Sequence, residues 1–192
     1  SSKFTLGQVL QLEGIYYLAV VILEVPSGYF SDRIGRKPTL IISALCLAGS
    51  YLLFLKGDTL EMFVLAKVLM AAGFACKSGT DASFHYDSHQ ALGLTDRFGD
   101  AEARVAGLSL RAAGIAALIG GFAGMHELSL PFAFSAVGAT IAAGLMMTCV
   151  EPTKSDERSS VGFVRQIGKT LSQLRNGSLS WLLGVAVLSI VL

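Results

Sequence analysis

Five apolar stretches of the length typical of membrane-spanning helices follow one another along the chain, separated by short polar or charged segments. A helix needs about 20 mostly apolar residues to cross the hydrocarbon core of a bilayer. The expected spans are 9–30, 38–55, 60–84, 105–125 and 130–150. The pattern therefore predicts an all-α, polytopic bundle of membrane helices over residues 1–150.

The longest polar stretch, 151–178, follows the fifth span. Apolar residues recur in it at helical spacing with basic residues between them, which predicts an amphipathic helix on the cytoplasmic membrane surface. The apolar run that follows, 179–192, would extend only about 21 Å as a helix, less than the ~30 Å hydrocarbon core. We interpret this run as the start of a further, truncated span.

The composition supports a membrane protein and excludes several other classes. Hydrophobic residues make up 53% of the chain and charged residues 15%, with a mean hydropathy of +0.61. Soluble domains have about 25% charged residues, so the composition excludes a disordered chain and nearly excludes a soluble globule. The net charge of +1 leaves no basic surface for nucleic acid. The three cysteines each lie in an apolar run, and no disulfide framework is expected.

Basic residues are distributed unequally between the two sides of the expected bundle. The loops on one side contain ten of them: Arg33, Arg36, Lys37, Arg97, Arg104, Lys154, Arg158, Arg165, Lys169 and Arg175. The loops on the other side contain Lys3 and Lys56. Because basic loops stay in the cytoplasm, the first side is expected to be cytoplasmic. The expected location is the cell membrane, which in a bacterium is the inner membrane.

A charged motif, GYFSDRIGRK at residues 28–37, joins the first two spans. It resembles the signature G-x-L-a-D-R-x-G-R-K/R of the major facilitator superfamily, with Phe30 where Leu is usual. In that family the signature joins the second and third helices. The resemblance implies a twelve-helix secondary transporter, of which this chain would represent helices 2 to 6 and the start of helix 7.

The motif also has a direct physical interpretation. A glycine such as Gly28 allows close helix packing, and Gly35 permits the sharp reversal of a short loop. Asp32 is placed to cap a neighbouring helix. The resemblance implies a cytoplasmic gate with a charge relay between Arg36 and Asp87, together with an Asp32 contact to the second half. The expected gate residues are Gly28, Asp32, Arg33, Gly35, Arg36, Lys37 and Asp87. The alternative is a loop that only fixes topology.

Two shorter stretches are similar to motifs of one bacterial branch of the same superfamily. The first, EVPSG at 24–28, leads into the loop motif; the second, SGTDASFHYD at 78–87, closes the third span. The superfamily's usual helix-4 Arg is missing, and Lys67 is the nearest cation.

Ionisable residues inside the spans are candidates for a transport cavity, because a charge near the bilayer centre costs roughly 2.5–3.5 kcal/mol on insertion scales. Glu13, Tyr17 and Glu24 share one helix face by their spacing, which suggests a polar stripe toward an aqueous cavity. Alternatively, Glu13 lies in the outer headgroup region and Glu24 makes a structural pair.

Four other ionisable residues of the spans have more than one interpretation. Lys67 could serve the cavity or extend to the outer interface. Lys77 and Asp81, four residues apart, could pair within one helix. Arg111 could pair with Asp81 or Asp87, or extend to the cytoplasmic interface.

No cofactor, metal or enzymatic activity is expected. His85 and His89 have the spacing of a metal pair but lack a third ligand, and neither a phosphate-binding loop nor a catalytic constellation occurs. The expected function is secondary active transport of a small solute by alternating access, as a symporter or antiporter. Its partners would be the solute, protons, the lipid bilayer and the remaining helices. The alternative is a non-transporting receptor or assembly protein on a transporter-like scaffold.

Overall fold

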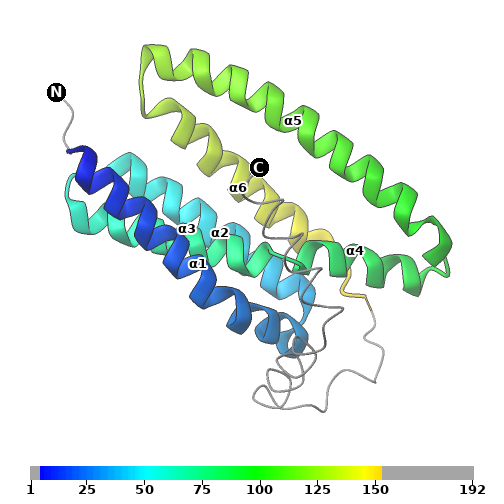
Figure 1. Ribbon diagram of the computed structural model, residues 1–192. Helices are drawn as coiled ribbons and strands as arrows, with labels where there is room; N and C mark the ends of the chain where they lie inside the picture. Colours follow the sequence, from blue (N-terminus) through cyan, green and yellow to red (C-terminus); the bar gives the residue numbers. More distant parts are fainter. Residues whose placement is uncertain (1–4, 153–192) are drawn as a thin grey trace, which may run out of the picture. The chain divides into compact units, whose positions relative to one another are not determined.

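The computed structural model describes residues 5–152 as a bundle of α-helices (Figure 1). The elements are α1 (Leu6–Ile34), α2 (Arg36–Lys56), α3 (Leu60–Lys77), α4 (Thr80–Ala91), the short 3-10 helix η1 (Thr95–Arg97), α5 (Phe98–His126) and α6 (Leu130–Thr148). This part of the chain contains no strand, so the predicted all-α bundle is confirmed. The amphipathic helix expected within 151–178 and the span expected at 179–192 lie outside the described residues, apart from Glu151 and Pro152.

Four described helical segments are long and apolar enough to cross a membrane: Leu6–Ile34, Arg36–Lys56, Thr95–His126 and Leu130–Thr148. The 18-residue α3 is not among them, and it carries Glu61, Lys67 and Lys77. Its position in the bundle, between α1 and α2, gives Lys67 a charged partner inside the protein, as described below.

The third expected span, 60–84, is two helices rather than one. The first ends at Lys77, and Gly79 then adopts the left-handed conformation with φ +70°. Glycine reaches this conformation without steric cost, which is why it commonly ends a helix. A new helix, α4, begins at Thr80 and continues to Ala91, through the segment that was expected to be a polar loop.

The helices α1, α2, α3 and α6 pack through small residues, as membrane helices do when backbones approach closely. Helix α2 packs between α3 and α6, and α1 packs mainly on α3 (Figure 1). Serine hydroxyls donate hydrogen bonds to carbonyls of α3: Ser27 to Ala75 (2.8 Å), Ser43 to Gly73 (2.7 Å) and Ser50 to Ala66 (2.9 Å). These side chains are buried, so the hydrogen bonds fix the spacing and register of α1 and α2 on α3.

The close approach expected at Gly28 occurs one residue earlier. A side chain added at Gly28 would meet nothing within 4 Å among the described residues, whereas Ser27 is buried against α3. The neighbouring position differs by about 100° around the helix, so a one-residue offset turns Gly28 away from α3.

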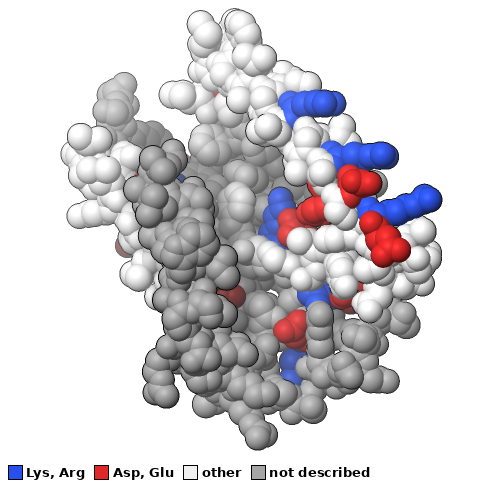
Figure 2. All heavy atoms as spheres, turned by 45° about the vertical axis from the view of Figure 1, so that its right-hand side comes forward, with Lys and Arg blue, Asp and Glu red and all other residues white. Residues whose placement is uncertain are grey.

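Helix α5 differs from the others in having no buried residue. Among the described elements it contacts mainly α6, α4 and η1. Charged side chains gather near the α4–α5 turn and along the adjoining part of α5, on the face drawn in Figure 2.

Candidate functional site

The reversal between α1 and α2 depends on Gly35. This residue has φ +123°, a conformation that L side chains rarely adopt. A Cβ at this position would also lie 2.9 Å from the Glu151 Oε1 atom and 3.2 Å from the Pro38 Cδ atom. Conformation and space therefore both require glycine, as the sequence interpretation of this loop expected.

The first turn of α2 is capped by Glu151, which comes just after the end of α6. Its Oε1 atom accepts a hydrogen bond from the Arg36 backbone N–H and its Oε2 atom accepts one from the Lys37 N–H, both at 2.8 Å. A carboxylate at this point satisfies two free donors and interacts favourably with the helix dipole. Lys37 Nζ donates in turn to the carbonyl of Met147 at 2.9 Å. The loop motif is thus bonded to the end of α6.

Glu151 was not predicted from the sequence as a site residue. Asp32 was the expected capping carboxylate, but its Oδ1 atom lies 3.8 Å from an Arg36 guanidinium nitrogen. The available signal was an acidic residue directly after the fifth apolar stretch, 130–150. Arg33 lies over the ring of Tyr29, with 5.3 Å between its Cζ atom and the ring centroid.

Arg36 and Asp87 form an ion pair between the loop motif and α4. Arg36 Nε donates to Asp87 Oδ2 at 2.5 Å, and the side chains are only 10% and 16% exposed. Charge-assisted hydrogen bonds are among the strongest in proteins, and removing one partner of a buried pair leaves the other charge uncompensated. The relay implied by the family resemblance therefore has its two residues in direct contact.

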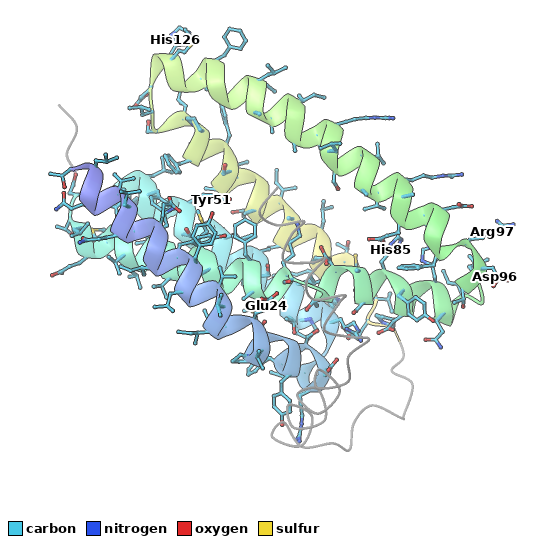
Figure 3. The ribbon with its side chains drawn as sticks, viewed as in Figure 1. Glu24, Tyr51, His85, Asp96, Arg97 and His126 are labelled. Carbon is cyan, nitrogen blue, oxygen red and sulfur yellow. The ribbon has the colours of Figure 1, made fainter. Side chains whose placement is uncertain are left out.

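A second cluster surrounds an open cavity of about 320 Å³ between α1, α3 and the start of α4. Figure 3 labels Glu24 on α1, where its Oε1 atom accepts a hydrogen bond from Ser78 Oγ at 3.2 Å. The two branch motifs noted in the sequence therefore meet here. The cavity is lined by Tyr16, Val20, Glu24, Phe74, Lys77, Ser78 and Asp81.

Lys67 is paired inside the bundle. Its Nζ atom lies 2.5 Å from Glu13 Oε1 and over the ring of Tyr16, 5.3 Å from the centroid. The Lys67 side chain is 16% exposed and therefore does not extend away to the outer interface.

The aromatic residue of the α1 polar stripe is Tyr16 rather than Tyr17. Tyr16 lines the cavity, contacts Lys67 and packs edge-on against Phe74, whereas Tyr17 is 65% exposed. Helical geometry places both tyrosines within about 60° of Glu13, on opposite sides, and spacing alone does not separate them.

Three expected pairings are not observed among residues 5–152. Lys77 and Asp81 lie on separate helices because the chain breaks at Gly79, and no ion pair joins them in this range. In the same range, Arg111 forms no ion pair with Asp81 or Asp87. Its side chain is exposed on α5.

The two histidines of α4 contact α5 and each other. His85 Nδ1 lies 2.7 Å from Glu102 Oε2, and the His85 and His89 rings are 4.5 Å apart. Among the described residues no group of three His, Cys, Asp or Glu side chains has the arrangement of a metal site.

Apolar helices that carry paired charges inside the bundle and at one end define a multi-span membrane protein. The family model of the Major Facilitator Superfamily matches residues 2–192, and the chain belongs to this family. A stretch of 60 residues is 32% identical to the inner membrane transport protein YajR of Escherichia coli (strain K12). The stretch is 31% of this chain and 13% of that relative's length. No solved structure matches the chain at comparable significance.

The contact between Gly35 and Glu151 can be tested by a double-mutant cycle. Gly35→Ala should lower the free energy of unfolding by about 1–3 kcal/mol through backbone strain and the clash with the carboxylate. Glu151→Ala should lower it by about 1–2 kcal/mol through loss of the cap. The double variant should lose less than the sum, because the clash disappears with the side chain. Strictly additive losses in thermal unfolding would contradict the contact.

Proposed function

We propose that the full-length protein is a secondary active transporter of a small solute, coupled to an ion and working by alternating access in the cytoplasmic membrane. Family membership supports a transporter, and the stretch similar to a protein named as an inner membrane transport protein supports the location. Such transporters expose a central site alternately to the two sides of the membrane.

The observation that carries the proposal is the pair of charged clusters on the described helices. One, Arg36 with Asp87, ties the loop motif to α4. The other borders an open cavity with Glu24, Lys77 and Asp81. Structural membrane helices rarely carry charges without a partner, because each costs free energy in the bilayer. A gate at the cytoplasmic end and an ion-responsive group at the cavity would account for both clusters.

The test is flux into proteoliposomes that contain the full-length protein, with an imposed pH gradient and a pH-sensitive dye inside. A panel of labelled amino acids, sugars, organic acids and organic cations is added in turn. We expect at least one compound to enter saturably and to move protons with it. If no member of the panel enters saturably in either gradient direction, a non-transporting receptor or assembly role becomes the better account.

Glu24→Gln separates a coupling role from a structural one. The variant removes a charge with little change in volume and can retain a hydrogen bond from Ser78. We expect gradient-driven uptake to fall at least tenfold, with a change in melting temperature of only a few degrees. The matched control is Glu127→Gln, which makes the same chemical change at the exposed α5–α6 turn and should leave uptake unchanged. Unchanged coupling in Glu24→Gln across pH 5–8 would assign Glu24 to structure alone.

A further inference from the structure

Three arginines lie on one face of α5 at intervals of seven residues. Arg97 is the residue that precedes the helix, and Arg104 and Arg111 follow at intervals of about 10.5 Å along the axis. Seven residues are nearly two helical turns, so the three side chains share a face. All three are exposed, and basic side chains stand out on this side of the molecule in Figure 2. We refer to these residues as the arginine stripe.

The length of α5 fixes the depth of the arginine stripe. The helix has 29 residues and is about 43 Å long, which exceeds the ~30 Å hydrocarbon core by roughly 13 Å. With His126 at the outer interface, the excess length lies at the cytoplasmic end, where the basic loops belong. Arg104 then lies at the level of the headgroups. Arg111 lies about one and a half to two turns deeper, and its long side chain can extend back to the same level.

The positive charge of the stripe is only partly neutralised by the described helices. Within residues 5–152, none of the ion pairs includes Arg97, Arg104 or Arg111. Three acidic residues lie near the start of α5, and one of them, Glu102, contacts His85 of α4. Asp96, next to Arg97, and Asp100, between Arg97 and Arg104, can offset part of the charge at this end of the stripe. No acidic residue lies within four positions of Arg111.

The same face of α5 is apolar between Arg104 and Arg111 and beyond the stripe. Leu108, Ile115, Leu118 and Phe122 lie within about 60° of the arginines around the helix, and each is 59–69% exposed. Positive charge at headgroup depth, followed by apolar side chains at core depth, matches the two parts of a phospholipid. If the partner were instead a polar protein surface, the apolar side chains at core depth would not be required.

We propose that the arginine stripe binds the headgroups of anionic phospholipids in the cytoplasmic leaflet, with the acyl chains lying along the apolar face of α5. Arginine forms paired hydrogen bonds with phosphate oxygens, and anionic lipids attract basic residues near the cytoplasmic surface. This assignment does not depend on what the protein transports.

The test titrates the full-length protein, purified in a neutral detergent, with phosphatidylglycerol and separately with phosphatidylcholine, and counts bound lipids by native mass spectrometry. We expect phosphatidylglycerol to bind at least tenfold more tightly. Arg104→Gln and Arg111→Gln should each weaken its binding about fivefold. Lys56→Gln, which removes an exposed positive charge at the external turn, is the matched control and should have no effect. Inorganic phosphate at the same concentration should not displace the lipid, because it lacks the acyl chains.

Several results would overturn the proposal. Equal affinity for the two lipids would do so, as would an unchanged preference in the variant that lacks all three arginines. Displacement by inorganic phosphate would point to a soluble anion instead. Cysteines placed at 104 and 111 provide a further check. If they cross-link to another part of the protein and are thereby protected from a lipid-soluble reagent, the stripe is a protein contact. Melting temperatures of all variants, measured without added lipid, identify any that are simply unfolded.

Discussion

Asp87→Asn is expected to lower the rate of transport by the full-length protein at least tenfold and to reduce its melting temperature by several degrees. In the wild type, Arg36 Nε lies 2.5 Å from Asp87 Oδ2 and the arginine residue is 8% exposed. In the variant, the carboxylate of Asp32, 3.8 Å away, is the remaining ion-pair partner of the guanidinium in the described part of the chain. Removing one partner of a fully buried pair costs about 3–5 kcal/mol, and a partly exposed pair costs about 1–3 kcal/mol.

A second variant separates the gate from stability. In Arg36→Gln/Asp87→Asn neither charge remains, so no unpaired charge is buried and much of the lost stability should return. Transport should stay low, because the proposed relay is still absent. Asp100→Asn, an equal change on the exposed part of α5, controls for the loss of a carboxylate. If the double variant recovers transport together with stability, the pair is structural and has no role in gating.

Gly73→Ala is the second substitution for which a large effect is expected. A Cβ at Gly73 would lie 2.7 Å from the Cγ atom of Leu47 and 3.1 Å from the carbonyl oxygen of Ser43. The backbone of α2 cannot yield without stretching the 2.7 Å hydrogen bond from Ser43 to Gly73. Overpacking of this kind costs about 1–3 kcal/mol, so the melting temperature should fall by several degrees.

The control for Gly73→Ala is Gly138→Ala in α6. A Cβ at Gly138 would meet nothing within 4 Å among the described residues, so the substitution adds only helix propensity, about 1 kcal/mol. The two variants should shift the melting temperature in opposite directions, measured by fluorescence during heating in detergent. Equal shifts would show that α2 and α3 are not packed as closely as the structure indicates.

The sequence was sufficient to predict the helical bundle and the loop at Gly35, because both follow from local signals. Long apolar runs specify spans, and a glycine within a short charged turn specifies a reversal. The break at Gly79 was missed because the polar segment around it, 77–81, is short and apolar residues resume at Ala82 and Phe84, and because hydropathy does not report φ.

The contacts that build the site could be predicted only in part. Arg36 and Asp87 were linked through the family resemblance and not through their own spacing. The cap by Glu151 joins residues 115 positions apart, and no local pattern encodes such a pairing. The choice between Tyr16 and Tyr17 depended on the exact rotation of α1 against α3, which is set by the buried Ser27 contact.

Because the helix breaks at Gly79, α4 can act as a lever that turns about this residue. At one end of this helix lies a glycine at which an added side chain would meet nothing within 4 Å, and Asp87 is held by Arg36 about 12 Å along the axis. If the proposed gate releases that ion pair, we expect α4 to rotate about Gly79. Because α5 follows α4 in the chain and contacts it, α5 should move with it.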